Sequence, residues 1–213
     1  MEFERLYSAH EDVFGQAPES LLRAHWSQLD GSRPILDIGA GQGRHSLFLA
    51  RCSLTVDALD PSLAAVEGLR AISAREGLPL ATHQASFEEF AALRAPYGGV
   101  LAFGLIPILT WSQIERLAQK LVQWTEPGSL LFLTAFTTKD PGFAKHQEDW
   151  DLIGENSFRS RAGEVRTYLR PGQLGELLPA QEVEQTREYL GPPHRHGDGP
   201  VHRHAIAEAL YRR

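Results

Sequence analysis

Cysteine and long apolar runs are both scarce in this sequence. Its 213 residues include one cysteine, Cys52, so an internal disulfide and a zinc site built from several cysteines are excluded. No apolar run approaches the roughly 20 residues that span a bilayer. The first five residues are mostly charged and lack the apolar core of a signal peptide. We therefore expect a cytoplasmic protein with no membrane partner.

Positive charge is also in short supply. Lysine and arginine number 21 against 27 aspartates and glutamates, which gives a formal net charge of −6. Proteins that bind nucleic acids broadly present a basic surface, so we expect no nucleic-acid partner. Basic residues do gather from His194 onward, where four arginines and four histidines accompany only two acids. This neutral-to-basic end suits a local anion site on an otherwise acidic protein.

A glycine-rich turn follows the first apolar run. The apolar residues Ile35, Leu36 and Ile38 read as a short buried strand, and residues 46–50 have helical spacing. Glycine permits positive φ and has no Cβ to keep a ligand away from the backbone. Dinucleotide loops have the spacing G-x-G-x-x-G, whereas Gly39, Gly41 and Gly43 give G-x-G-x-G, preceded by Asp37. A dinucleotide loop with slipped spacing and a turn without any ligand are the alternatives.

A second acid follows at the end of the next apolar strand, residues 54–60. Asp60 lies 23 residues after Asp37, about the separation at which a βαβ unit delivers an acid to a ribose. Two hydroxyls of a sugar diol can each donate to one carboxylate oxygen. The segment Asp60-Pro61 also resembles a helix cap followed by proline in the first turn, and the two roles are compatible.

Helices and strands alternate regularly through the middle of the chain. We predict helices at 64–75 and 112–125, strands at 78–84, 97–104 and 130–136, and a turn at 126–129. This order predicts an α/β fold with a doubly wound, mostly parallel sheet in a single domain that covers residues 1–213.

The two ends of the chain complete this domain. Residues 1–30 read as a helical cover, and the polar residues 137–162 as a long excursion in the usual place for a substrate lid. Residues 164–174 are predicted to begin the last helix. Residues 183–190 and 201–211 read as two strands of a closing antiparallel hairpin, which brings the sheet to seven strands.

These patterns together resemble class I methyltransferases, which use S-adenosylmethionine (SAM). Residues 37–50 read D-I-G-A-G-Q-G-R-H-S-L-F-L-A, similar to D-L-G-C-G-x-G-R-x-S-L-Y-L-A of the tellurite-resistance (TehB-like) methyltransferases. Residues 163–168, G-E-V-R-T-Y, are similar to the G-E-L-R-x-Y-Y of that family, and His194-Arg195 to its L-H-R. The resemblance implies SAM as cofactor and a small-molecule acceptor.

The resemblance also implies which residues bind the cofactor. In class I enzymes an acid after the third strand commonly receives the adenine amino group; here Ser86 stands in that place, and Phe87 can cover an adenine face. We assign the cofactor site to Asp37, Gly39, Ala40, Gly41, Gly43, Arg44, Asp60, Pro61, Ser86, Phe87 and Phe103.

In the TehB-like family a His-Arg pair and a later arginine are implicated at the substrate. His194 and Arg195 match the pair, while the later position holds Val201, with Arg203 two residues on. We therefore expect His194, Arg195 and Arg203 to act on a small anionic or soft acceptor, such as a chalcogen oxyanion or a thiol. An O- or N-methyltransferase of a neutral metabolite, a SAM-binding module without turnover and a nicotinamide oxidoreductase are the alternatives.

Two pairs of histidines flank the turn of the closing hairpin, His194 with His196 and His202 with His204. Residues two apart on a strand share a face, so metal ligation is conceivable. No acid or cysteine is fixed beside them in the sequence. We therefore expect solvated histidines and no metal.

Overall fold

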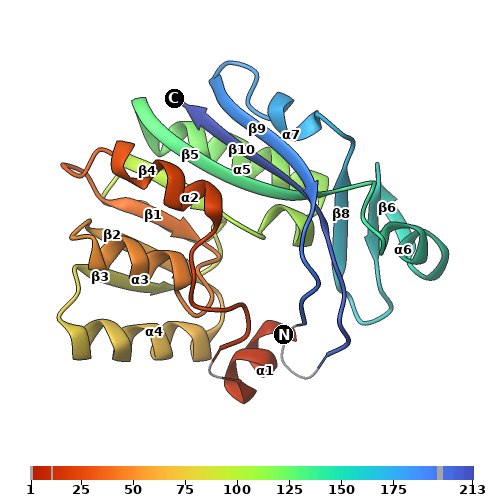
Figure 1. The fold of residues 1–213 in the computed structure, drawn as a ribbon, viewed down its shortest axis with the longest axis horizontal. Coiled ribbons are helices and arrows are strands. Elements are labelled where there is room, and N and C mark those ends of the chain that lie inside the picture. The colour runs from red at the N-terminus through yellow and green to blue at the C-terminus, as the bar shows by residue number, and fades with distance from the viewer. Residues whose placement is uncertain (1, 11, 196–198) are drawn as a thin grey trace.

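Alternating helices and strands make up the computed structural model (Figure 1), which describes residues 2–10, 12–195 and 199–213. The helices are α1 (Glu2–Ala9), α2 (Ser20–His25), α3 (Arg44–Arg51), α4 (Leu63–Glu76), α5 (Trp111–Gln123), α6 (Phe143–Asp149) and α7 (Gln173–Glu176), with 3-10 turns η1 (Trp26–Gln28) and η2 (Ile106–Ile108). The strands are β1 (Ile35–Ile38), β2 (Val56–Asp60), β3 (Leu80–Gln84), β4 (Tyr97–Ala102), β5 (Thr125–Thr137), β6 (Asp151–Gly154), β7 (Ser157–Arg159), β8 (Val165–Leu169), β9 (Glu182–Leu190) and β10 (Ala205–Arg212).

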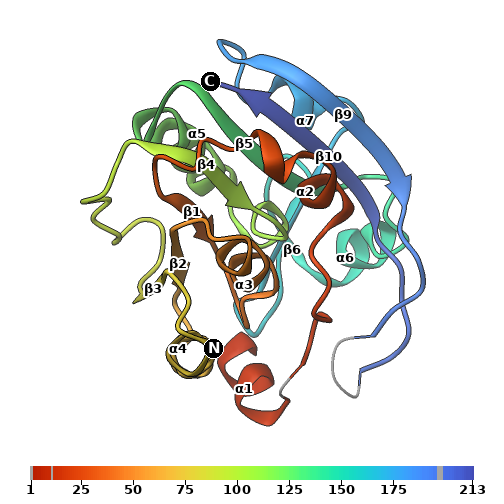
Figure 2. The ribbon, with the colours of Figure 1, turned by 60° about the vertical axis from the view of Figure 1, so that its left-hand side comes forward.

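The main sheet has the order β3-β2-β1-β4-β5-β10-β9. Its first five strands are parallel, and β10 pairs antiparallel with both β5 and β9. Figure 2 shows β10 lying between β5 and β9. The predicted doubly wound sheet with an appended antiparallel hairpin is therefore confirmed, but the predicted count of seven strands is too low, because β8, β7 and β6 continue the sheet from β5 to ten strands in the described part of the chain.

The central strands are apolar because both of their faces are covered. Every residue of β1, β2 and β4 is buried, as expected for parallel strands between two helical layers. Ile114 and Leu117 of α5 pack on one face of the sheet, and Leu22 of α2 and Leu49 of α3 pack on the other. In Figure 1, α2 and α3 lie on the near face and α5 runs behind the sheet.

The connection between β9 and β10 lies at the edge of the sheet where the parallel strands end. Ile206, near the start of β10, pairs with Phe136, near the end of β5. The described residues between Leu190 and Ala205, 191–195 and 199–204, therefore extend beyond the carboxyl ends of the parallel strands. In open α/β sheets this edge is where ligands bind, and both the glycine turn and Asp60 lie there.

Residues 137–174 differ from the prediction in two ways. The expected excursion contains α6, β6 and β7, and the expected last helix is wrong, because residues 165–169 form β8. Strands β6, β7 and β8 form a small antiparallel unit. Its outer strand β8 pairs with the last two residues of β5, so this unit extends the sheet sideways at the carboxyl edge.

The predicted turn at 126–129 is also part of β5, since that strand begins at Thr125. A register shift between Tyr97 and Gly99 of the neighbouring strand accommodates the extra residues. Within the described ranges, no helix combines the length and the apolar character needed to cross a membrane.

Candidate functional site

The glycine turn between β1 and α3 is built as the sequence predicts. Gly39, Gly41 and Gly43 have φ angles of 71°, 52° and 87°, a region that other residues enter only with strain. The backbone N–H groups of Gly39 and Ala40 both donate to the carbonyl oxygen of Leu59, at 2.8 and 3.0 Å. The turn is thereby fastened to the end of β2.

Two of these glycines also allow close packing. A Cβ atom at Gly43 would lie 2.3 Å from a methyl carbon of Leu69 in α4, and one at Gly41 would lie 2.8 Å from the hydroxyl oxygen of Tyr7 in α1. Tyr7 therefore lies directly against the turn. The N-terminal cover reaches the predicted cofactor site through this side chain.

Asp60 joins the glycine turn to the start of α4. Its Oδ2 accepts from the backbone N–H of Gly41 at 2.8 Å, and its Oδ1 accepts from the N–H of Ser62 at 2.9 Å. Only 7% of the residue is exposed, and burial raises the pKa of its carboxyl group. The cap of α4 is Ser62, whose Oγ accepts from Ala65, so Asp60 is not the cap. Pro61 is exposed beside it.

Asp37 lies beneath the turn. It is 1% exposed, and its Oδ2 accepts a hydrogen bond from the hydroxyl of Ser46 at 2.6 Å. Burial raises the pKa of Asp37 to about 6. This geometry makes Asp37 a brace between β1 and the first turn of α3.

Arg44 contacts the N-terminal segment. Its guanidinium donates to the carbonyl oxygen of Phe14 at 3.1 Å and pairs with Glu19 at 2.7 Å. Next to it in the turn, Gln42 accepts from the N–H of Val13 and donates to the carbonyl oxygen of His10. These contacts fix His10 and residues 13–19 against the turn.

Ser86 and Phe87, the two residues predicted to contact adenine, both interact with other residues of the protein. The hydroxyl of Ser86 donates to Glu89 at 2.8 Å and accepts from the N–H of the same residue. Phe87 is 4% exposed and packs in the core cluster that includes Ile38 and Leu59. Little of the Phe87 ring therefore faces outward at this edge.

His45 is a site residue that the sequence did not reveal. Its ring stacks on Phe103, which follows β4, with centroids 4.5 Å apart and planes inclined by 30°. Among the described residues, its Nε2 is a buried side-chain polar atom without a hydrogen-bond partner. Burial lowers the pKa of this imidazole well below its ordinary value, so the ring is neutral. A lone histidine at the start of a helix gives no signal in the sequence that its ring will stack on Phe103.

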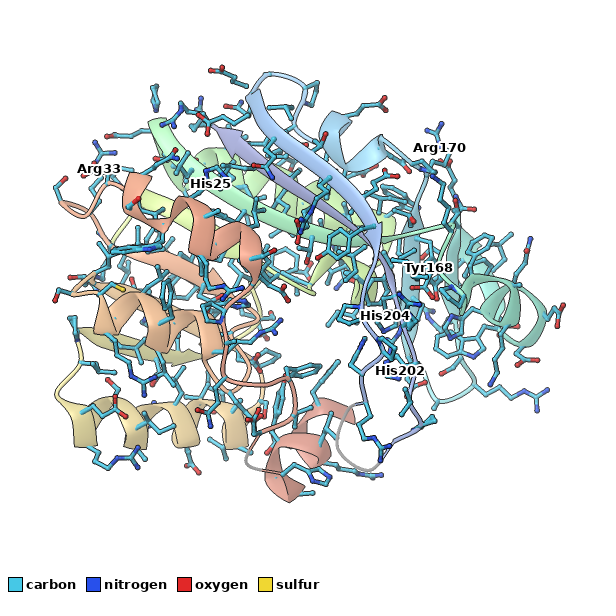
Figure 3. The ribbon with its side chains drawn as sticks, in the orientation of Figure 1. His25, Arg33, Tyr168, Arg170, His202 and His204 are labelled. Atoms are coloured by element: carbon cyan, nitrogen blue, oxygen red, sulfur yellow. The ribbon has the colours of Figure 1, made fainter. Side chains whose placement is uncertain are left out.

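The closing hairpin brings three histidines together. The backbones of His194 and His202 exchange both hydrogen bonds, at 2.9 and 2.8 Å, and the ring of His204 lies 5.3 Å from that of His194 and 4.9 Å from that of His202. Figure 3 shows His202 and His204 near each other on this hairpin. Burial and the two neighbouring imidazoles lower the pKa of His194. His196 lies outside the described residues.

The two predicted arginines of the hairpin occupy other positions. Arg195 is exposed. The Nε of Arg203 donates to the backbone carbonyl oxygen of Gly191 at 2.7 Å, so its guanidinium is held by its own hairpin. The structure therefore groups His194 with His202 and His204, whereas the sequence grouped it with Arg195 and Arg203.

A cavity of about 290 Å³ lies elsewhere, between α7 and the β9–β10 pair. Its lining includes the exposed Arg187, which forms an ion pair with the buried carboxylate of Glu208, and Tyr189 donates to the same carboxylate at 2.7 Å. These groups satisfy one another. The cavity is remote in sequence and topology from the glycine turn.

Comparison with known proteins agrees with this geometry. Residues 35–128 match a family described as a methyltransferase domain. The fold is similar to that of TehB from Haemophilus influenzae, with a TM-score of 0.65 and 19% identity over 84% of this chain and 57% of that one. It is also similar to a SAM-dependent methyltransferase from Methanosarcina mazei, with a TM-score of 0.71 and 16% identity over 92% of this chain and 98% of that one.

A curated relative, named hemagglutinin 1, from Eikenella corrodens, is 28% identical over an alignment of 132 residues, and the match covers 55% of this chain and 44% of that protein. The chain thus spans less than half of this relative.

Residues 35–128 thus match a methyltransferase domain, and the chain has the fold of class I SAM-dependent methyltransferases. The resemblance to TehB-like methyltransferases that the sequence displays extends to the three-dimensional fold.

Proposed function

We propose that the protein transfers a methyl group from SAM to a small anionic or soft acceptor, a chalcogen oxyanion or a thiol, held at the closing hairpin. The observation that carries this proposal is the glycine turn clamped to Asp60 at the same edge of the sheet as the hairpin. The similarity to TehB, whose family the sequence resembles, supports the choice of acceptor.

The residues at the carboxyl edge suit SAM. Asp60 already accepts one backbone N–H at each carboxylate oxygen, and each oxygen keeps a further lone pair for a ribose hydroxyl. The buried Nε2 of His45 is an orphaned polar atom beside the turn, and a bound molecule that donates a hydrogen bond would satisfy it. Ser86, in place of the usual acid, supplies one acceptor at most for adenine.

SAM, when bound, supplies a methyl group on a sulfonium that departs as a neutral thioether. The protein contributes alignment and exclusion of water, and alignment alone can lower the barrier by about 7–11 kcal/mol at best. Tyr7 and the segment fixed by Arg44 cover the turn and exclude water there. An anionic acceptor needs cationic donors rather than a base, and Arg195 with Arg203 supplies them.

A neutral hydroxyl or amine is the second candidate acceptor. It is favoured by the lowered pKa of His194, because a neutral imidazole can accept a proton as a general base. The hydrogen bond from the Nε of Arg203 to Gly191 also leaves fewer guanidinium N–H groups for an anion.

Acceptor profiling with methyl-labelled SAM tests the proposal. We expect transfer to thiols or chalcogen oxyanions, with kcat/KM lowered about 10- to 100-fold in Arg195→Ala, the loss that one charged hydrogen bond represents. Arg23→Ala changes an exposed arginine on α2 and serves as the control. Transfer only to neutral hydroxyls or amines would refute the anionic acceptor. SAM binding without methylation of any acceptor in a broad panel would favour a binding module.

A further inference from the structure

The three histidines of the closing hairpin have the spacing of metal ligands. One nitrogen from each of His194, His202 and His204 lies within 4.8 Å of the other two. The ring centroids of His194 and His202 are 4.5 Å apart. The two sides of the hairpin both contribute a histidine, and the backbone pairing of His194 with His202 fixes the separation of these two residues.

Each of these imidazoles is also held at its other nitrogen by a hydrogen-bond acceptor. The Nδ1 of His194 lies 3.1 Å from the carbonyl oxygen of Pro192, and the Nδ1 of His202 lies 2.9 Å from that of Pro200. A carbonyl oxygen can only accept, so Nδ1 carries the proton in both rings. In the uncharged form of each ring, the lone pair is then on Nε2.

Asp140 performs the same task for His204. Its Oδ2 lies 2.9 Å from the Nδ1 of His204 and also accepts the backbone N–H of Ala205 at 3.0 Å. Its Oδ1 accepts from Gly142 at 2.7 Å. Asp140 is buried, and the His204 ring stacks on Phe136 at 3.9 Å. The carboxylate and the stacking partner set the plane of this imidazole.

A carboxylate or carbonyl that accepts from the second ring nitrogen is the usual support of a metal-bound histidine. All three rings have such a support. We propose that His194, His202 and His204 bind one divalent late first-row transition metal ion, with zinc as the best fit, through their Nε2 atoms. Three neutral imidazoles suit zinc and its neighbours rather than magnesium or calcium, which prefer oxygen. The sequence predicted no metal here because Asp140 is distant along the chain.

Zinc would draw the rings slightly together. Zinc–nitrogen bonds of about 2.0–2.1 Å in tetrahedral geometry separate the ligand nitrogens by roughly 3.4 Å. The present limit of 4.8 Å is wider, so binding requires small rotations of the side chains. Three protein ligands leave a fourth position for water or a substrate, as in catalytic zinc sites.

The role of the fourth position rests on the proposed function, whereas the binding of the ion does not. A metal ion in this place lowers the pKa of a thiol or hydroxyl that coordinates it and holds the deprotonated form. The acceptor would then be activated without a general base. In this arrangement His194 is a metal ligand rather than a direct contact to the acceptor.

Zinc titration of the chelator-treated full chain by calorimetry tests the proposal. We expect one zinc per chain, no binding of magnesium, and affinities at least about 100-fold weaker in His202→Ala and His204→Ala, since loss of a supporting group alone costs 10- to 100-fold. His25→Ala removes a histidine that bonds to Gln185 and is the matched control. Equal zinc affinity in His202→Ala, His25→Ala and the unaltered chain would overturn the proposal, as would no zinc binding at all.

A second measurement needs no substitution. In nitrogen-15 spectra of the histidine rings, zinc should shift the Nε2 signals of three histidines while their Nδ1 remains protonated. Shifts confined to other histidines would contradict the site. SAM titration of the same samples separates the two proposals: His202→Ala should keep SAM affinity, and zinc binding in a chain that fails to bind SAM would overturn the proposed function but leave the metal site intact.

Discussion

Asp60 holds two backbone amides at the place where we propose that ribose binds. Asp60→Ala removes the acceptor of the Gly41 and Ser62 N–H groups as well as the acceptor of the ribose hydroxyls. We expect SAM affinity to fall by about 10- to 100-fold or more, the range for loss of charge-assisted hydrogen bonds. Calorimetric titration with SAM measures this change.

Ser62→Ala is the matched control, because it changes the same turn and keeps the carboxylate. The serine caps α4 through its contact with Ala65 and also donates to Glu4 of α1, so we expect a stability loss of about 1 kcal/mol and a smaller loss of SAM affinity than in Asp60→Ala. Equal losses of affinity in Asp60→Ala and Ser62→Ala would contradict the assignment of Asp60 to the ribose.

Asp37 gives the protein a pH-dependent stability. Its pKa in the folded protein is about 6, against 3.8 for an unperturbed carboxyl, so the folded state binds the proton more tightly. The stabilisation from this proton is fully present below pH 3.8, the pKa of the carboxyl group in the unfolded chain, and it is lost as the pH rises through 6. From pH 5 to pH 7 the loss amounts to about 1 kcal/mol.

Asp37→Asn removes this titration while an amide oxygen can still accept from Ser46. Urea unfolding at pH 5 and pH 7 measures the unfolding free energy of both proteins. Relative to Asp37→Asn, we expect the unaltered protein to lose about 1 kcal/mol of stability between these two pH values. The same difference at both pH values would show that the carboxyl group does not titrate in this range.

The glycine turn and Asp60 could be predicted from sequence because positive φ and close backbone approach leave almost no residue but glycine. The contacts of Tyr7, His45 and Asp140 could not. Each of these side chains meets its partner only after segments far apart in the chain have packed. A local pattern has no information about such pairs.

Helix α1 is attached to the rest of the molecule through Glu4. Its carboxylate accepts from the hydroxyl of Ser62 at 2.6 Å and from the N–H of Ala64 at 3.3 Å, and these contacts lower its pKa. In Glu4→Ala we expect faster hydrogen exchange across α1 and faster SAM dissociation, because Tyr7 is carried on the same helix. Arg5→Ala, an exposed change on α1, should leave both rates unaltered.

Strand β8 shows why the sequence misled at residues 164–174. The segment contains alternating Val165, Thr167 and Leu169, which suits a strand, but also a polar pattern consistent with a helix start. Pairing with distant strands determines that this segment is a strand. Thr167 pairs with Ser157 of β7, and Tyr168 pairs with Phe136 of β5. Residues 137–162 remain a proposed lid, now built from α6, β6 and β7.

The main sheet links every element into one unit, so we predict that residues 1–213 unfold as a single domain. Far-UV circular dichroism and tryptophan fluorescence should give coincident urea transitions. Saturating SAM at 100 times its dissociation constant should add about 2.7 kcal/mol to the unfolding free energy.

Trp150→Phe removes the tryptophan that follows α6 and identifies any separate signal from the small unit. An early fluorescence transition that disappears in Trp150→Phe would show that residues 137–162 unfold independently of the sheet.

The position of β10 between β5 and β9 has a consequence for how the protein assembles. Strand β5 presents an open row of backbone groups until a segment far along the chain arrives to pair with it. Long-range pairings of this kind slow folding, and an unpaired edge invites association between chains. Shortening the chain before residue 205 should therefore cause aggregation during expression, even though the glycine turn and Asp60 would be intact.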